Sequence, residues 1–551
     1  MRCIVFALCA AVLLPTCKDS GKADFVLLNG KIYTADARDR FVEAVAVKEG
    51  VIAGLGSSRK MEDWIGPSTE VLDVGEHLVT PGFIDAHCHF ASGGKSLIYL
   101  NFRGVGSLEK IQDRVAARVK KLAPGAPVFG GQFDHTLFPG QKWPCKEDLD
   151  EVSPHNPVVI RRIDGHSVWV NSLALELSGI DASTPDPFGG EIVRDSRTGN
   201  PTGILKEAAA GLLEVPRPDN HSSLEEDIKR GLDHAAALGI TGLHTASGMD
   251  ELKIYRKLDR GGDLTLRVYG WLSYGEIDAC IEKGIRQGKG DDKVKTGFLK
   301  IFVDGTISSS TALLFEPFSD EPGEAGLPQH KEEELYALVE KAHEHGFQVG
   351  MHAIGDRAVR WALNAVERAQ RKHGLKGLRH RIEHVSLLHP DDVPRFRAMG
   401  VIPSMQPTFC TTDLMYCEQR FGKERCREVY VWKSLLENGA LPAFGTDWPV
   451  EPLDPMRGLY SCVTRKSIDF GVPENGWFPG QCLTMAEAVR HYTFGSAHAA
   501  FEEDLKGTLE KGKLADMAVL SKDLFTIDAE EILSTEVLFT ILGGRIVYRR
   551  N

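Results

Sequence analysis

The sequence predicts an α/β fold: a (β/α)8 TIM-like barrel with a small β-sandwich domain formed by both chain ends. Two observations predict the barrel. Short apolar strands alternate with helical stretches through the middle of the chain, and several of these strands end in a histidine or an aspartate. Strand–helix alternation indicates a parallel sheet, and a barrel gathers the carboxyl ends of its strands on one face. The sandwich is predicted because strand-like segments without intervening helices occupy both chain ends.

The strand-like segments at the chain ends are short and bounded by turn residues. Near the N-terminus they are Phe25–Tyr33 and Glu43–Ala53, with turns at Gly30 and Gly50. The C-terminal segments are Asp516–Leu520, Val537–Ile541 and Arg545–Tyr548. We therefore expect residues 23–80 and 501–551 to form the sandwich together.

The barrel is expected over residues 81–500, with an insertion around 129–203. The chain between His89 and the strand that contains Lys300 is longer than two βα units need, at roughly 30 residues per unit. The Pro- and Gly-rich stretches within it therefore predict an additional element over the barrel mouth.

Residues 1–22 resemble a secretory leader followed by a short tether. Met1-Arg2 precedes an apolar run to Leu14 that is too short to span a membrane. Leu14–Cys17 resembles a bacterial lipoprotein cleavage site, although Pro15 and Thr16 replace the usual small residues. We expect an exported protein, periplasmic or anchored to a membrane through a lipid on Cys17; a cytoplasmic protein is the alternative.

The composition is that of an ordinary globular protein. The 551 residues are 42% hydrophobic and 26% charged, with a net charge of −12. The charge is spread without basic runs, so we expect no nucleic-acid partner. A small-molecule substrate is expected, and the sequence leaves a homo-oligomer open.

The stretch Pro81–His89 ends in His-Cys-His. His87 and His89 follow a predicted strand, and residues i and i+2 of a strand point to one face. Both imidazoles can therefore reach one metal ion. Two polar loop histidines are the alternative interpretation, so the pair depends on further ligands downstream.

Further ligand candidates follow in later strands. Lys300 lies inside an apolar strand, His352 and His384 end two others, and Asp447 ends a fourth. The alternatives are a lysine whose amine reaches solvent along the barrel and an aspartate turn before proline. A lysine among apolar strand residues needs a partner, which favours a site.

The residue set resembles the amidohydrolase superfamily, and more closely amidohydrolase family 3, which includes N-substituted formamide deformylase and the YtcJ-like proteins. Segments outside the ligands match it too: Asp164–His166, Gly199–Glu207, His352–Asp356, Ser404–Pro407, Gly445–Pro452 and Gly512–Asp516. The resemblance implies that the metal ligands are His87, His89, Lys300, His352, His384 and Asp447. It also implies that Lys300 is carboxylated and bridges the metals.

This ligand set suits zinc, as one or two ions, although manganese, iron or cobalt would also be held. We expect Asp447 to act as the catalytic base, and His166 to help polarise the substrate carbonyl; a packed loop histidine is the alternative for His166. One departure stands out: the branch commonly shows Gln-Pro-x-His, whereas this chain has Phe409 at the last position.

The predicted function is hydrolysis of a non-peptide, amide-type carbon–nitrogen bond through a metal-activated water. A deaminase or cyclic-amide hydrolase of the same superfamily is the alternative. Deaminases of the superfamily usually use one metal and lack the bridging lysine, so Lys300 favours a two-metal site. A catalytically inactive binding lipoprotein is the alternative from another class, and the complete ligand set argues against it.

Overall fold

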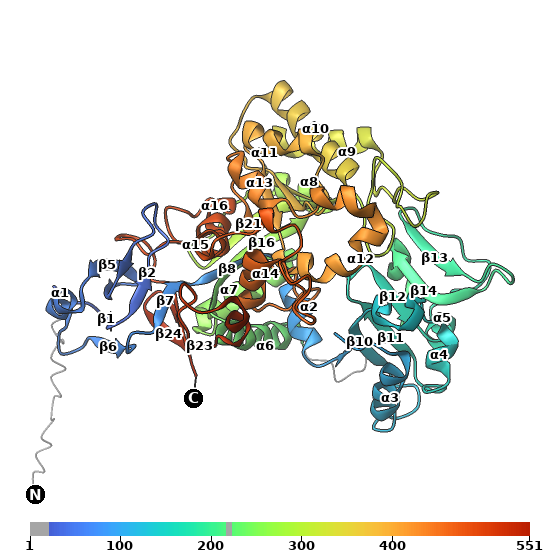
Figure 1. Cartoon of the computed structure of the whole chain (residues 1–551), viewed down its shortest axis with the longest axis horizontal. Coiled ribbons are helices and arrows are strands. Elements are labelled where there is room, and N and C mark those ends of the chain that lie inside the picture. The colour runs from blue at the N-terminus through green and yellow to red at the C-terminus, as the bar shows by residue number, and fades with distance from the viewer. Residues whose placement is uncertain (1–20, 216–222, 551) are drawn as a thin grey trace, which may run out of the picture.

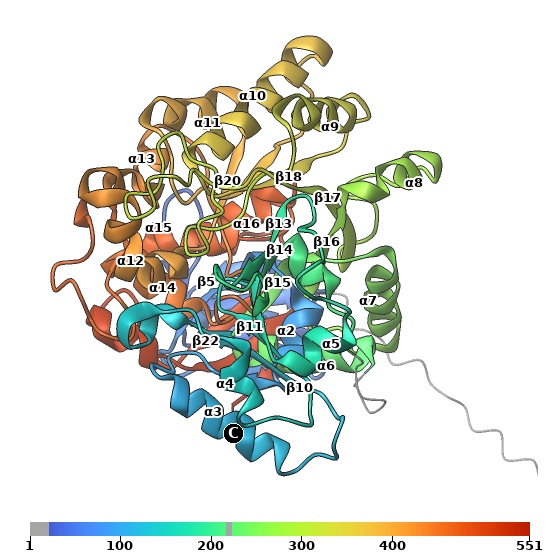
Figure 2. The ribbon, with the colours of Figure 1, turned by 90° about the vertical axis from the view of Figure 1, so that its right-hand side faces the viewer.

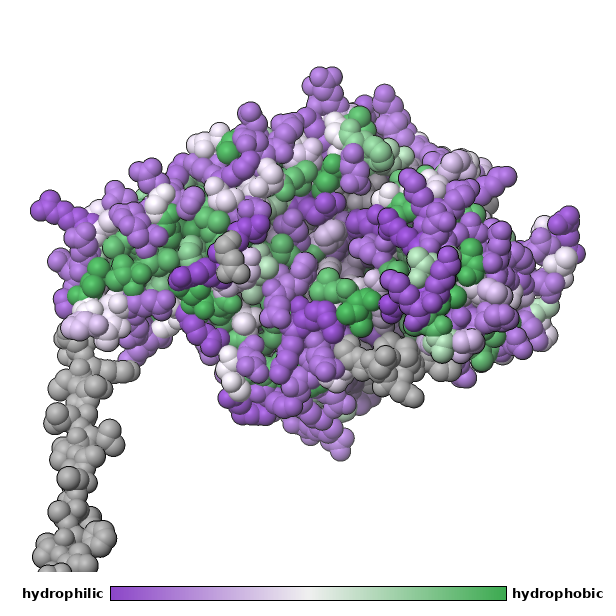
Figure 3. Space-filling model, turned by 90° about the horizontal axis from the view of Figure 1, so that it is seen from below, coloured by the Kyte–Doolittle hydropathy of each residue, from purple (hydrophilic) through white to green (hydrophobic). Residues whose placement is uncertain are grey.

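The computed structural model describes residues 21–215 and 223–550. The predicted leader and Cys17 lie outside the described residues. Within the described ranges, no helix combines the length and apolar character needed to cross a membrane. The face shown in Figure 3 is mostly hydrophilic, with smaller hydrophobic areas between hydrophilic residues.

An eight-stranded parallel sheet forms the centre of the molecule (Figures 1 and 2). Its order is β21-β20-β19-β18-β17-β16-β15-β8. The strands are β8 (Phe83–Cys88), β15 (Ile240–Ala246), β16 (Arg267–Ser273), β17 (Val294–Phe302), β18 (Val349–Ala353), β19 (Arg381–His384), β20 (Ile402–Met405) and β21 (Ala443–Phe444). The predicted barrel is therefore confirmed.

The first and last strands meet just beyond β21. The Asp447 N–H donates to the His87 carbonyl at 2.6 Å, and the His89 N–H donates to the Trp448 carbonyl at 2.7 Å. A Cβ atom at Gly445 would lie 2.5 Å from the backbone nitrogen of His87. Only glycine permits this approach, so the sequence Gly445-Thr446-Asp447 brings the two ends of the sheet together.

Helices connect successive strands and cover the outside of the barrel (Figure 2). They include α6 (Leu224–Ala237), α7 (Met249–Gly261), α8 (Ile277–Glu282), α9 (Glu332–Glu344), α10 (Asp356–His373), α11 (Val393–Met399), α13 (Trp432–Glu437) and α14 (Pro455–Thr464). In α10, Ala358, Ala362 and Ala365 are buried at helical spacing. Its last turn is basic, which complements the helix dipole.

Both chain ends contribute to one six-stranded sheet, ordered β24-β23-β22-β7-β2-β3. A four-stranded sheet, β5-β4-β1-β6, lies beside it, and the two share a buried cluster that includes Val45, Val79 and Ile541. Their strands are β1 (Phe25–Leu28), β2 (Lys31–Tyr33), β3 (Phe41–Val42), β4 (Ala44–Lys48), β5 (Val51–Gly56), β6 (Glu70–Asp73), β7 (Leu78–Pro81), β22 (Met517–Leu520), β23 (Val537–Leu542) and β24 (Arg545–Arg549). The barrel strand β8 follows β7 after a single residue, so this layer leads directly into the site.

A fourth sheet is inserted between β8 and β15. Its order is β13-β14-β12-β11-β10-β9, and it lies at the right of Figure 1. The strands are β9 (Leu100–Asn101), β10 (Val128–Phe133), β11 (Val158–Arg162), β12 (Ser167–Val170), β13 (Gly190–Arg194) and β14 (Pro201–Glu207). The sheet begins before the expected 129–203 stretch because β9 has only two residues, too few for a pattern in the sequence.

Candidate active site

The carboxyl ends of the barrel strands bring three predicted ligands into one buried group. His87, His384 and Asp447 each offer a ligand atom, and these atoms all lie within 4.8 Å of one another. They come from β8, from β19 and from the segment after β21. Residues distant in sequence are thus adjacent, as expected for a barrel.

His87 is oriented by a buried ion pair. Its Nδ1–H donates to Glu383 Oε2 at 2.6 Å, and Arg381 binds both oxygens of Glu383 at 2.8 and 3.1 Å. Burial, with the charge of Lys300 second, holds the pKa of His87 well below its ordinary value. The ring is therefore neutral and its Nε2 carries no proton, which is the form that binds metals. Metal-binding histidines usually donate their other ring N–H to a carboxylate in this way.

His384 reaches the site because the backbone turns at the end of β19. Its φ is +78°, in the left-handed region. Gln406 Oε1 lies 2.8 Å from its Nδ1 and accepts from it, which leaves Nε2 for the group. Burial holds the pKa of His384 well below its ordinary value as well.

His89 and His352 border the group. His89 Nε2 lies 3.2 Å from Asp447 Oδ1. The His352 ring lies 4.4 Å from the His384 ring, centroid to centroid, but its Nε2–H donates to the Gly305 carbonyl at 3.1 Å. In this arrangement Nδ1 is the His352 nitrogen that remains for a metal.

Lys300 points into the same space. Its Nζ lies 3.4 Å from His87 Nε2, and it sits over the Trp271 and Phe302 rings at 5.1 and 5.0 Å. Only 4% of the residue is exposed, so its amine does not extend to solvent. Burial lowers the pKa of Lys300 to about 8, although Glu383 acts against this. No carboxylate among the described residues pairs with it.

Asp447 faces the histidine nitrogens of this group. Its Oδ1 is buried and lies 3.2 Å from His89 Nε2 and 3.4 Å from His87 Nε2. Burial would raise the pKa of Asp447, but His89, His87 and Lys300 hold it below the ordinary value. A buried carboxylate oxygen that faces imidazole nitrogens fits a divalent cation, because buried charges are paired or coordinate metals.

A further carboxylate fixes the segment that carries Asp447. Asp85 accepts hydrogen bonds from the backbone N–H groups of His87 and Thr446 and from the Thr446 hydroxyl. Burial raises the pKa of Asp85 to about 7 against these bonds. Asp85 thereby ties the first barrel strand to the last.

His166 comes from the inserted sheet and lies against the barrel group. Its ring is 5.1 Å from that of His352, and its Nδ1–H donates to Glu207 Oε2 at 2.7 Å. Burial would lower the pKa of His166, but Glu207 outweighs it and raises the pKa to about 9. The imidazole is therefore a cation at neutral pH. Glu207 belongs to a segment that the sequence singled out only by resemblance.

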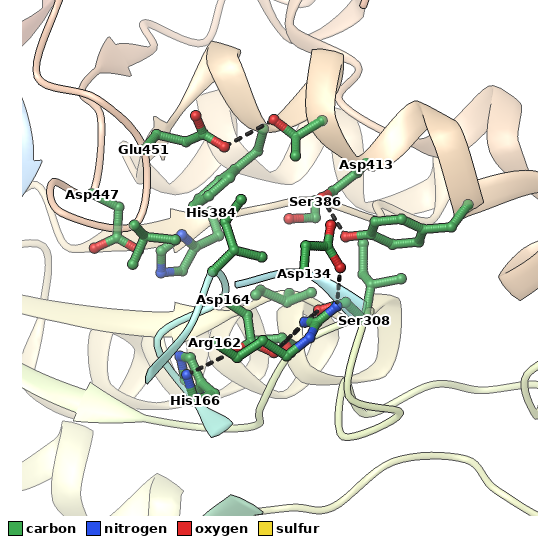
Figure 4. A pocket seen from close by; sticks show the side chains of 18 of the residues that line it. Asp134, Arg162, Asp164, His166, Ser308, His384, Ser386, Asp413, Asp447 and Glu451 are labelled. Atoms are coloured by element: carbon green, nitrogen blue, oxygen red, sulfur yellow. Dashed lines mark hydrogen bonds and ion pairs between the residues drawn. The ribbon is translucent and has the colours of Figure 1, made fainter. Parts of the chain in front are cut away.

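Part of this group lines one pocket (Figure 4). The barrel contributes His352, His384 and Asp447, and the inserted sheet contributes Arg162, Asp164 and His166. The pocket thus lies between the barrel and the inserted sheet. Phe409, at the departure from the family pattern, also lines it.

The fold and the site define a barrel hydrolase with its polar groups at the carboxyl ends of the strands. The amidohydrolase family matches residues 70–548, and the chain belongs to this family, which confirms the resemblance seen in the sequence.

The chain is 34% identical to YtcJ of Bacillus subtilis over 533 residues, which cover 95% of this chain and 99% of that protein. It is 28% identical to the N-substituted formamide deformylase of Arthrobacter pascens, over 96% of this chain and 98% of the enzyme. Among solved structures, an uncharacterized metal-dependent hydrolase from Pyrococcus horikoshii superposes with a TM-score of 0.73 at 29% identity, over 92% and 99% of the two chains.

Proposed function

We propose that this protein is a metal-dependent amidohydrolase that cleaves a non-peptide carbon–nitrogen bond. The observation that carries the proposal is the buried group of His87, His384 and Asp447, in which the Asp447 carboxylate faces the imidazole nitrogens. The formamide deformylase relative, similar over nearly its whole length, supports the bond class.

His87, His89, His352, His384 and Asp447 would hold the metal, and the imidazole–carboxylate set suits zinc. A bound zinc would lower the pKa of a coordinated water to about 7 and polarise a carbonyl oxygen. The Nδ1 hydrogen bonds of His87 to Glu383 and of His384 to Gln406 leave Nε2 of each ring for the metal.

Lys300 is proposed to be carboxylated. Its amine is buried, lies beside His87 Nε2 and has no carboxylate partner in the described part of the chain. The neutral amine attacks carbon dioxide, forms an N–C bond and releases a proton; a pKa near 8 leaves part of the population in that form. The resulting carbamate is an anion with two oxygens, which suits a site with two cations better than a deaminase site.

The chain supplies the proton transfers. Asp447, whose pKa is held below its ordinary value, accepts a proton from the attacking water and delivers it to the leaving nitrogen. His166, held protonated by Glu207, donates a hydrogen bond to the substrate carbonyl oxygen as negative charge develops on it. Residues of the barrel and of the inserted sheet are therefore both needed.

The test is hydrolysis by chelator-treated and zinc-reloaded protein of N-formyl, N-acyl and cyclic amides, with an aminopurine as a deamination substrate. Zinc-dependent cleavage of an amide, lost in Asp447→Asn, supports the proposal. Ammonia release from the aminopurine without amide cleavage assigns a deaminase instead. Stoichiometric zinc binding without turnover of any substrate, in protein with a carboxylated Lys300, assigns a binding protein.

A further inference from the structure

The pocket continues beyond the metal-ligand group to a second polar end. Helix α12 (Pro407–Arg425) begins directly after Gln406, which orients His384. Phe409, Thr412, Asp413 and Tyr416 all line the pocket. Their spacing of three and four residues places them on one face of the helix. This face leads from the reacting centre to Asp413, and Figure 4 shows Asp413 on the side of the pocket away from Asp447.

Asp413 is held in place by two phenols. The Tyr416 hydroxyl donates to its Oδ1 and the Tyr430 hydroxyl to its Oδ2. Each carboxylate oxygen can accept more than one hydrogen bond, so both keep capacity for a ligand. No lysine, arginine or histidine of the described chain lies within ion-pair distance of Asp413.

The cations around this end are already neutralised. Arg162 is fully buried and pairs with Asp134 at 3.0 Å and Asp164 at 2.6 Å, so two carboxylates face one guanidinium. Four of its five N–H groups are used, by these two residues, His135 and Ser308. The pocket's other cation, His166, pairs with Glu207.

Another acidic residue that lines the pocket, Glu451, adds no donor to it. Glu451 accepts from the Thr412 hydroxyl at 2.8 Å and pairs with Arg103 at 3.0 Å. The Thr412 hydroxyl proton is thereby used. Among the described residues, the far end therefore presents hydrogen-bond acceptors and carboxyl groups, with no unpaired cation for a substrate carboxylate. Burial raises the pKa of Asp413 to about 7, and a cationic donor beside this carboxyl group would favour its ionised form.

We infer that this end of the pocket seats a cationic hydrogen-bond donor, such as a primary ammonium, at the non-reacting end of the substrate, with Asp413 as the specificity-determining residue. The inference rests on the proposed amide hydrolysis and narrows its substrates to amides that carry a basic group. Ile163, Ile307 and Val450 line the pocket as well, and their apolar side chains suit a methylene spacer between the two ends.

The test compares three N-formyl compounds of equal chain length that end in an ammonium, a hydroxyl or a carboxylate, over several spacer lengths. Charge-assisted hydrogen bonds predict a kcat/KM about 10- to 100-fold higher for the ammonium than for the alcohol at the best length, and lowest for the carboxylate. In Asp413→Asn the ammonium-to-alcohol ratio should fall to about 1. Asp250→Asn, an exposed aspartate of α7, is the matched control and should keep the ratio.

Hydrolysis of the alcohol compound with no preference for the ammonium, or with a preference for the carboxylate, would overturn the inference and leave the proposed function standing. If no amide is hydrolysed, the proposed function fails, and binding decides the inference. Zinc-loaded wild type should then be stabilised thermally by an alkylammonium more than by the matching alcohol or alkanoate; equal or reversed shifts overturn it. The wild-type measurements decide the matter even if Asp413→Asn does not fold.

Discussion

Replacing Glu383 by glutamine should lower the affinity for zinc, although Glu383 is not one of the predicted ligands. The Glu383 carboxylate is fully buried and accepts from His87 Nδ1 at 2.6 Å and from Arg381 at 2.8 and 3.1 Å. Glutamine keeps the shape but removes the charge, so His87 becomes a poorer ligand. Loss of such a supporting carboxylate typically costs about 10- to 100-fold in metal affinity, or about 1.4–2.8 kcal/mol.

The same substitution also costs stability, because it leaves Arg381 buried without its anion. Removing one partner of a buried pair destabilises by about 3–5 kcal/mol. Glu502→Gln separates the two effects. Glu502 is buried and pairs with Lys295 and Lys506, each at 2.7 Å, away from the predicted ligands. It should lose stability without losing zinc.

The assay is a zinc titration against a competing fluorescent chelator, with urea unfolding of the metal-free proteins alongside. We expect Glu383→Gln to bind zinc about 10- to 100-fold more weakly than wild type, and Glu502→Gln to bind it normally. Wild-type zinc affinity in Glu383→Gln, or an equal loss in Glu502→Gln, would refute the orienting role of Glu383.

Four other expectations follow from the site and the sequence. Lys300→Ala should lose most activity and at least one metal, with partial rescue by added short carboxylates; unchanged metal content and turnover would exclude a bridge. Asp447→Asn should lower kcat by about 10²–10⁴, measured under saturating zinc, and near-normal turnover would exclude Asp447 as the base. Because the pKa of His166 is raised, its protonation contributes to folding stability; this contribution is fully present below about pH 6.5 and is lost as the pH rises through about 9. The protonated ring is also the proposed hydrogen-bond donor, so kcat/KM should fall as the pH rises through about 9 in wild type but not in His166→Gln. Cell fractionation should find the wild type outside the cytoplasm and membrane-bound, with Cys17→Ser released, whereas a cytoplasmic wild type with Met1 retained would contradict export.

The sequence could predict which barrel residues lie near one another because strand geometry is periodic. His87 and His89 share a face at spacing two, and parallel strands put His352, His384 and Asp447 at one end of the barrel. The inference needed only residue types and order along the chain.

Glu383 and Arg381 were not predicted, for a geometric reason. In a regular strand Glu383 would face away from its neighbour His384. The left-handed φ of His384 breaks that alternation, so both side chains serve the same site. No pattern in the sequence marks a non-glycine residue with this φ. The sequence did show one signal, since two charged residues at spacing two in a short buried strand need partners.

The start of α12 explains what Phe409 changes. The motif that begins at Gln406 contributes to this fold at two separate positions. Gln406 accepts from His384 and so supports the metal-ligand group, and that half of the motif is retained. Phe409 lies one helical turn later, with its ring 6.1 Å from that of His384 and its side chain on the pocket wall that continues to Asp413. Under the proposed function, a phenylalanine there would remove a polar contact to the substrate and would keep the support that Gln406 gives to His384. The departure would then change which amide fits the pocket and leave the means of cleaving it intact, which agrees with the proposal that Asp413 holds the far end of the substrate.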